Sequence, residues 1–448
     1  MTMNFQKTTK MKNNRLLLLF TFSFATLSIV ANEEWTLRHC IDYALEHNIT
    51  VKQYDNTRRS NEIDLNTSQH NRLPSITAGT SQSFNFGRSL NADNSYVSRN
   101  TTSSSGDISM SVPVFSGFRL PKETENYRLN LQASLEDLKK AKEDICLQVT
   151  SAYLQAIYDK EALKIAQEQI SLSSEQLSRL EKMVEAGKSA ESELYEARSQ
   201  VAQDKMSAVK SENALRLSLL DLSQLLELST PDSFDVVTPQ DITITLTPSS
   251  PEQIYFQALA IKPVVQAQQL RVEAAQTAIE IARSAYYPTL NFTAGMGTSY
   301  YKTSGYDENS FSRQIKDNFS KSFGLSLSIP IFNGFQTRNS IRKAKIGVEN
   351  QQLQLENIRK TLYKEIQQAY YNAINSNASY LSSIEAEKAA NASFELVSKK
   401  YENGKANATE YNETKTKREQ AEINRLQSQL QLLFNKKILS FYAGEELK

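Results

Sequence analysis

Residues 109–118 read SMSVPVFSGF, and residues 326–335 read SLSIPIFNGF, so the same pattern occurs twice, with Ser109 corresponding to Ser326. The triplet AGK at residues 186–188 returns as NGK at residues 403–405 with the same offset, which leaves no gap between the two matches. A shared offset over this length indicates an internal repeat. We therefore interpret the chain as one structural unit that is present twice.

Upstream of these matches the offset is smaller by three positions, because residues 73–75 (LPS) correspond to residues 287–289 (YPT). The loop that follows this triplet is therefore expected to be three residues longer in the second copy. The repeat predicts a first unit over residues 32–230, a Pro-rich linker over residues 231–251 and a second unit over residues 252–448.

Long stretches without Gly or Pro predict long helices. From Lys122 to Ala186, 65 residues contain neither residue type, and a helix of this length would be ~100 Å long. Helix packing on this scale is typical of a rod, a scaffold or a tube. The expected helices cover residues 32–73, 119–186 and 188–230 in the first unit and residues 264–287, 336–403 and 405–443 in the second.

Apolar residues in the two long helices recur every seven positions, which is the spacing of a coiled coil. Gly347 interrupts the second series. The first series is Val149, Ala156, Leu163, Ile170, Leu177 and Val184, and the second is Ile341, Val348, Leu355, Leu362 and Ala369.

Residues 76–87 and 323–331 alternate apolar with small polar residues. This pattern fits membrane β-strands that face lipid on one side and water on the other, although soluble hairpins remain the alternative. It predicts one hairpin over residues 73–118 and another over residues 287–335, which makes four strands in the chain. The hairpin tips, residues 88–105 and 302–320, are rich in Ser, Asn, Asp and Lys, as surface loops are.

Four strands cannot close a barrel, and an open sheet edge in lipid leaves unpaired backbone groups that cost several kcal/mol each. Two copies would give eight strands with a filled interior, whereas three would give twelve with room for a lumen. We therefore expect a mixed fold class, all-α plus membrane β-barrel, in which three chains form a 12-stranded barrel that an α-helical barrel continues.

The N-terminus and the composition limit the class of protein. Residues 1–31 predict a signal peptide, because basic residues precede an apolar run that ends at Ala31; a retained membrane anchor is the alternative. Lys and Arg number 51 against 50 Asp and Glu, which is no footprint for nucleic acid. Two cysteines, Cys40 and Cys146, are too few for a disulfide framework.

Motifs of catalysis are missing from the sequence. The three histidines, His39, His47 and His70, do not have the four-residue spacing of a helical metal pair. The sequence contains neither a Gly-rich phosphate loop nor a nucleophile elbow. We therefore expect no enzyme activity, no cofactor and no metal.

The chain resembles the TolC-type outer-membrane efflux proteins, also called outer membrane factors. The likeness rests on the duplicated layout, on the two repeated strand ends and on the opening WTLRHCIDYAL at residues 35–45, and it runs from about Glu34 to Gly444. It implies a homotrimer in the outer-membrane lipid with a large periplasmic part. It also implies docking to a periplasmic adaptor protein and an inner-membrane pump of the RND or ABC type, and an equatorial position for the linker with its strand-like residues 241–246.

Two pairs of glutamates follow the predicted helix turns at equal offsets. Glu193 and Glu196 lie six and nine residues after Gly187, and Glu410 and Glu413 lie six and nine residues after Gly404. Residues three apart share a helix face, and solvated helix surface is the alternative role for both pairs.

The resemblance assigns roles at these turns. It implies that Glu410 and Glu413 ring the closed periplasmic entrance, that Tyr401 belongs to the gate network, and that Glu193 and Glu196 support them. Ala406 stands where relatives can carry arginine, and Lys188 and Lys405 are nearby substitutes for the cation of an ion-pair latch. The turns themselves, Gly187 with Lys188 and Gly404 with Lys405, are the expected docking tips for the adaptor.

The leading hypothesis is a passive export duct of a tripartite efflux or type I secretion system. A trimeric coiled-coil surface adhesin or scaffold is the alternative, because long heptad series suit both. Two separated amphipathic hairpins, one before each long helix, favour the duct. A stand-alone porin is disfavoured because only a small part of the chain has the pattern of strands.

Overall fold

We describe the protein from a computed structural model. It describes residues 35–90, 94–98, 100–228, 234–238, 250–305, 307 and 309–445. The predicted signal peptide and the predicted strand at residues 241–246 lie outside this part of the chain. None of the helices in the described residues combines the length and the apolar character needed to cross a membrane.

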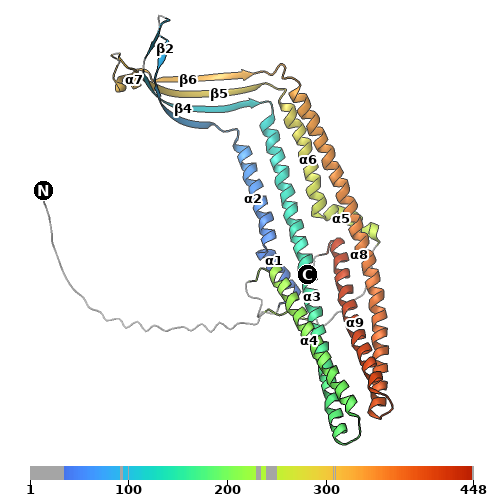
Figure 1. The fold of residues 1–448 in the computed structure, drawn as a ribbon. Helices are drawn as coiled ribbons and strands as arrows, with labels where there is room; N and C mark the ends of the chain where they lie inside the picture. The colour runs from blue at the N-terminus through green and yellow to red at the C-terminus, as the bar shows by residue number, and fades with distance from the viewer. Residues whose placement is uncertain are drawn as a thin grey trace, which may run out of the picture. The chain divides into compact units, whose positions relative to one another are not determined.

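Helices and a β-sheet occupy separate parts of the described chain (Figure 1). The first half contains α1 (Leu37–His47), α2 (Ile49–His70), β1 (Ser75–Asn85), β4 (Thr101–Ser116), α3 (Arg119–Glu185) and α4 (Glu191–Leu225). The second half contains α5 (Pro251–Ile261), α6 (Pro263–Ser284), β5 (Thr289–Thr303), β6 (Ser320–Ser328), α8 (Gln336–Glu402) and α9 (Ala408–Tyr442).

Corresponding helices of the two halves have equal lengths. α3 and α8 both contain 67 residues, and their starting points share the offset of the strand-end motifs. α4 and α9 both contain 35 residues and begin at this same offset. α2 and α6 both contain 22 residues, and their starting points have the smaller offset of the triplets LPS and YPT. The helices therefore repeat at the two offsets at which the sequence motifs repeat.

A Gly-Phe pair turns each second strand region into its long helix. Phe118 and Phe335, the residues before α3 and α8, both have a left-handed backbone with φ of 65°. Gly117 precedes the first of them with φ of 62°, and a Cβ there would lie 2.6 Å from the Ser284 carbonyl oxygen. Glycine is therefore required at this corner both by its backbone conformation and by the close approach of α6.

The helix expected over residues 32–73 is two helices. Asn48 interrupts it with an extended backbone, because its side chain accepts a hydrogen bond from the Thr50 amide (2.9 Å) and donates one to the Leu225 carbonyl (3.0 Å). α5 and α6 are separated in the same way at Lys262, which precedes Pro263, and a residue before proline avoids the helical conformation.

The four long strands form one antiparallel sheet in the order β1-β4-β5-β6. The sequence pattern misplaced the ends of several strands of this sheet. β6 stops at Ser328 rather than at residue 331, since Pro330 has no amide to donate to a ladder. The predicted hairpin tip at residues 88–105 contains a small hairpin of β2 (Arg88–Leu90) and β3 (Tyr96–Ser98), and also the start of β4. The predicted tip at residues 302–320 contains α7 (Phe311–Asp317).

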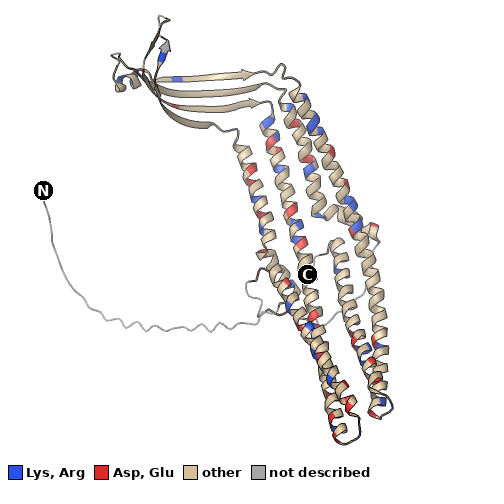
Figure 2. Ribbon diagram, in the orientation of Figure 1, with Lys and Arg blue, Asp and Glu red and all other residues tan. Residues whose placement is uncertain are grey.

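The sheet has one apolar and one polar face. Register pairs Ile76 with Met110, Met110 with Ala294 and Ala294 with Phe323, which places all four on the same face. Large apolar side chains of this face are exposed in the chain: Ile76, Phe84, Ile108, Met296, Phe323, Leu325 and Leu327. The opposite face carries mostly Ser, Thr and Gly. Figure 2 shows how few charged residues the sheet has compared with the helices.

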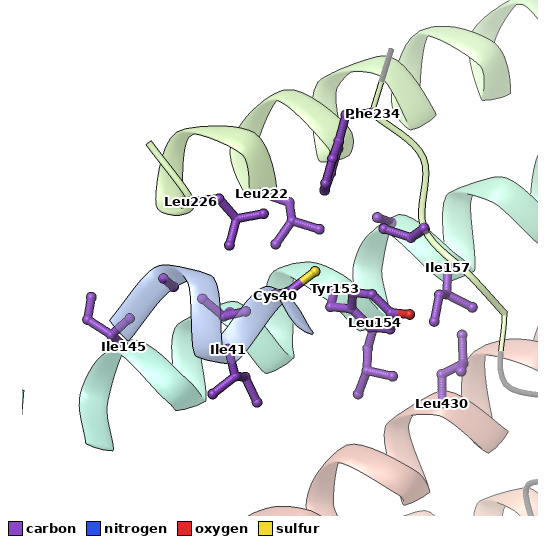
Figure 3. Close-up of a cluster of buried hydrophobic side chains, with 14 of the residues drawn as sticks. Cys40, Ile41, Ile145, Tyr153, Leu154, Ile157, Leu222, Leu226, Phe234 and Leu430 are labelled. Carbon is purple, nitrogen blue, oxygen red and sulfur yellow. The ribbon is translucent and has the colours of Figure 1, made fainter. Parts of the chain in front are cut away.

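Three apolar clusters of the described residues hold the helices together. The largest joins α1, α2, α3, α4, α9 and residues 234–238, and Figure 3 shows Cys40, Leu222, Leu226 and Phe234 gathered in it. The Tyr153 hydroxyl donates to the Val237 carbonyl at 2.7 Å, which ties this described piece of the predicted linker to α3. The second cluster joins α5, α6, α8 and α9. The third joins Phe394 and Val397 of α8 to Tyr411 of α9.

Candidate functional site at the helix turns

The turns α3–α4 and α8–α9 have the same geometry. Gly187 and Gly404 both have φ of 69°. The Lys188 amide donates to the Met183 carbonyl at 2.8 Å, and the Lys405 amide donates to the Lys400 carbonyl at 2.8 Å. These bonds form the Schellman motif that ends a helix at a left-handed glycine. All four residues predicted as docking tips are exposed.

The first pair of predicted gate residues lies at the start of α4. Glu193 is half-buried in the first turn and its carboxylate accepts a hydrogen bond from the Ser189 hydroxyl. Glu196 lies one turn further on and is exposed. A carboxylate in the first turn of a helix also interacts favourably with the helix dipole.

The second pair has a different environment at the start of α9. The Glu410 amide donates to the Asn407 side chain at 2.8 Å, so Asn407 caps this helix. The side chains of both Glu410 and Glu413 are exposed in the chain. They are therefore available to a neighbouring molecule or to solvent, which is the arrangement that both the gate role and the solvated-surface role require.

Tyr401 lines a pocket with the first pair of glutamates and not with the second. Its ring stacks on Tyr411 with 5.0 Å between centroids. Burial raises the pKa of the Tyr401 phenol, the charges of Glu193 and Glu196 raise it further, and a hydrogen bond with Gln176 opposes them. One small pocket is lined by Glu193, Glu196 and Tyr401, among other residues. Glu410 and Glu413 do not line this pocket.

A buried ion pair near this pocket escaped the sequence analysis. Lys415 Nζ lies 2.6 Å from Asp204 Oδ2, and their side chains are 3% and 9% exposed. Lys415 also donates to the Gln169 carbonyl at 3.4 Å. The pair therefore connects α9 to both α4 and α3. Burial and the Asp204 charge raise the pKa of the neighbouring Glu419.

A signal for this pair was present in the helix pattern. Lys415 shares a buried stripe of α9 with Tyr411 and Leu426, and Asp204 lies between the buried Val201 and Ala208 of α4. Opposite charges on two otherwise apolar stripes indicate a buried pair, since an unpaired charge is rarely buried. The partner itself could not be chosen without the packing of the helices.

The described residues contain no cluster of three or more His, Cys, Asp or Glu that could hold a metal ion. Cys40 is buried and Cys146 half-buried, and both are free thiols. Burial raises the pKa of Cys40 to about 12 and that of Cys146 to about 11. Both thiols are therefore kept protonated within apolar packing.

Comparison with known proteins gives the class of this chain. The family model "Outer membrane efflux protein" matches residues 40–227 and 254–445. The chain belongs to the outer membrane efflux protein family, which confirms the resemblance seen in its motifs.

Two curated relatives are similar over part of their length. Protein CyaE of Bordetella pertussis is 25% identical over 265 residues, which are 56% of this chain and 53% of that protein. Outer membrane efflux protein BepC of Brucella suis is 23% identical over 318 residues, which are 71% of this chain and 63% of that protein. The chain thus spans less than two thirds of each relative.

Solved structures show the same fold. The CmeC outer membrane channel of Campylobacter jejuni has a TM-score of 0.76 at 16% identity, and covers 92% of this chain and 86% of its own. The MtrE outer membrane channel of Neisseria gonorrhoeae, in its open state, has a TM-score of 0.74 at 18% identity, with 92% and 89% covered. The family and these neighbours are outer-membrane channel proteins.

Proposed function

We propose that three copies of this chain form an export channel in the outer membrane. The observation that carries the proposal is the four-stranded sheet, which has an exposed apolar face, a polar face and two edge strands, β1 and β6. An apolar face suits lipid and a polar face suits a water-filled lumen. The signal peptide predicted at residues 1–31 agrees with export to this membrane.

The two sheet edges require partners in lipid. Each unpaired backbone group there would cost several kcal/mol, and pairing β6 of one copy with β1 of the next would satisfy both edges. Two copies would close eight strands, whose side chains fill the interior, whereas three close a 12-stranded barrel with a lumen. Trimerisation is therefore the assembly that yields a channel.

The helices would continue this lumen into the periplasm as an α-helical barrel. Each half of the chain contributes one 67-residue helix, and the equal lengths and offsets of the halves support an internal duplication. Apolar side chains of α8, among them Leu353, Tyr371 and Leu381, are exposed in the single chain. Neighbouring copies would bury them. The alternative function, a surface adhesin, would give no role to a sheet with one apolar and one polar face.

The family and the ends of the helices support the proposed partners. The exposed turns at Gly187–Lys188 and Gly404–Lys405 offer two docking tips of equal geometry for a periplasmic adaptor. A pump of the RND or ABC type in the inner membrane would supply the energy, and this chain would act passively, without a cofactor. The name of BepC supports efflux as the kind of export.

Glu410 and Glu413 are the candidate entrance ring of this channel. Three copies would place six carboxylates around one aperture, where a constricted low-dielectric opening strengthens their attraction for cations. Their exposure in the chain supports this role. Tyr401, with Glu193 and Glu196, would hold the two hairpins together behind the ring.

The test starts from membrane fractions of cells that express the full chain. We expect the mature protein in the outer membrane, a trimeric mass in detergent by light scattering, and ion-conducting channels in planar bilayers. A monomer in the soluble periplasmic fraction would contradict the proposal. Deletion of the gene should raise sensitivity to an exported toxic compound or block a secreted substrate, and restoring the gene should reverse either effect.

A further inference from the structure

The polar face of the sheet is lined by hydroxyl groups that pair across strands. Thr77 Oγ1 lies 2.8 Å from Ser109 Oγ, and Ser81 Oγ lies 2.7 Å from Ser105 Oγ. Strand register continues this face through the described strands. Its members in β1, β4 and β5 include Ser75, Thr77, Ser81, Ser105, Ser109, Ser111, Thr293 and Ser299. The face is polar but, with one exception, uncharged.

Asp107 is that exception. The four long strands contain three charged residues, Asp107, Lys302 and Lys321. Register pairs Lys302 with Thr102 and Lys321 with Met296, and Thr102 and Met296 both share the face of Ile108. The two lysines therefore belong to the apolar face, and Asp107 is the only charged residue on the polar face of these described strands.

The neighbouring strands leave the Asp107 carboxylate open. Asp107 pairs with Gly79 of β1 and Gly297 of β5, so both flanking positions lack a side chain. A Cβ at Gly79 would lie 3.2 Å from Asp107 Oδ1, and one at Gly297 would lie 3.4 Å from Asp107 Cβ. The carboxylate thus lies over the Gly79 backbone and is exposed on the polar face.

We propose that Asp107 sets the charge preference of the membrane part of the channel, favouring cations over anions. The inference rests on the proposed trimer, in which the polar face lines the lumen and three Asp107 carboxylates form a ring at one level of the barrel. This ring is separate from the glutamates at the helix turns. The favoured solutes are inorganic cations and cationic organic cargo.

The ring acts through its field and not by holding an ion. Twelve strands ~4.8 Å apart and tilted by ~40° give a barrel about 24 Å across. The carboxylates are then further apart than the Debye length of ~8 Å at physiological salt. Their effect on passing ions is therefore expected to be strong at 0.01 M salt, where the Debye length is ~30 Å, and to vanish at 1 M, where it is ~3 Å.

The glutamates at the helix turns are distant from Asp107 but lie on the same ion path in the proposed channel. α8 alone contains 67 residues and, as a helix, is ~100 Å long, which is about three Debye lengths at 0.01 M salt and more at higher salt. The effects of Asp107 and of the turn residues should therefore add. A Glu410→Gln/Glu413→Gln background removes the second charged constriction from the measurement, so that a change at Asp107 is not masked.

The experiment measures reversal potentials of purified trimers in planar bilayers at 0.01, 0.1 and 1 M KCl. Asp107→Asn keeps the side-chain shape and removes the charge. We expect it to lower the cation-to-anion permeability ratio at 0.01 M about twofold or more and to leave the ratio at 1 M unchanged. Asp107→Ser removes the charge with a residue type already common on this face, so the test does not depend on a single variant.

Two controls test whether the permeability ratio depends on a carboxylate anywhere on the polar face, and not on charge elsewhere on the sheet. Asp107→Ser/Ser109→Asp moves the carboxylate to the next site on the same face, and should restore the parental ratio. Lys321→Gln removes a charge from the opposite face, and should leave the ratio unchanged.

An unchanged low-salt ratio in both Asp107→Asn and Asp107→Ser trimers would overturn the inference while leaving the proposed channel intact. Equal changes at 0.01 M and 1 M would also overturn it, since screening must remove a field effect. Failure of the parental protein to form trimers or channels would instead contradict the proposed function.

Discussion

α3 and α8 have the same length and the same starting corner, yet they are packed very differently. Of their 67 residues, α3 buries 19 and α8 buries nine. α3 contacts α1, α2, α4, α6 and α9, whereas α8 contacts α5, α6 and α9. One copy of the repeat is therefore largely surrounded within the chain, and the other lies at its edge (Figure 1).

Equivalent residues show what this difference means. Ile157 of α3 is 1% exposed, and Ile374, which occupies the equivalent position of α8, is 42% exposed. Leu129 and Ile346 form a second such pair, at 7% and 57%. The apolar pattern is repeated, but a single chain buries more of the first copy than of the second. We infer that a neighbouring copy buries the second.

The largest effect is expected from charges placed at one equivalent pair. Ile157→Asp puts an unpaired carboxylate into the core, which costs several kcal/mol, and should prevent accumulation of the folded chain. Ile374→Asp should leave the helix content unchanged and prevent trimer formation. Circular dichroism and light scattering of the detergent-extracted proteins measure the two outcomes.

A trimer of normal stability with Ile374→Asp would break the comparison, because α8 would then be exposed in the assembly as well. Lys388→Asp, a charge change on the same helix, serves as the control for a general effect of added negative charge.

The second prediction concerns the ion pair that ties α9 to α3 and α4. Lys415→Met leaves Asp204 buried without its partner, and should lower the free energy of unfolding by about 3–5 kcal/mol. The double variant Lys415→Met/Asp204→Leu should recover most of this loss, since apolar replacement of both partners removes the buried charge. Unfolding by guanidinium chloride in detergent measures both, and additive losses would exclude the coupling.

The third prediction compares the two pairs of glutamates. Glu410→Gln/Glu413→Gln should weaken the cation preference and the block by multivalent cations in planar bilayers, because it neutralises the proposed ring. Glu193→Gln/Glu196→Gln should have a smaller effect, because Glu193 is half-buried beside Tyr401. The reverse order would place the ring in the first copy. No effect from either pair would identify solvated helix surface.

The smallest effects are expected at the turns, where the two copies are alike. Gly187→Ala and Gly404→Ala each force a side chain into a left-handed backbone, at a cost of roughly 1–2 kcal/mol. The two losses should be equal because both residues have φ of 69°. Gly347→Ala, inside α8 with open space around it, should stabilise by roughly 0.5–1 kcal/mol. Unequal losses at the turns would show that their surroundings differ.

The local features of the candidate site were predictable from the sequence. The contacts between its two helical hairpins were not. Gly187 and Gly404 indicate the helix ends, because glycine takes the left-handed conformation that a helix C-terminus needs. The placement of Tyr401 against Glu193 and Glu196 depends on how one helical hairpin is rotated against the other. Side chains on helices distant in sequence leave no periodic signal of their mutual contacts.

The sequence by itself determined the repeat, the long helices, the strand regions and the family, because these depend on spacing within short windows and on motifs along the chain. It did not determine the break at Asn48, which depends on a hydrogen bond to Leu225 across 177 positions. Only the tertiary structure decided which copy of the apolar pattern is the more buried one in the chain. Burial of a helix requires other elements packed on each side of it, and a repeated local sequence pattern does not specify which elements pack there.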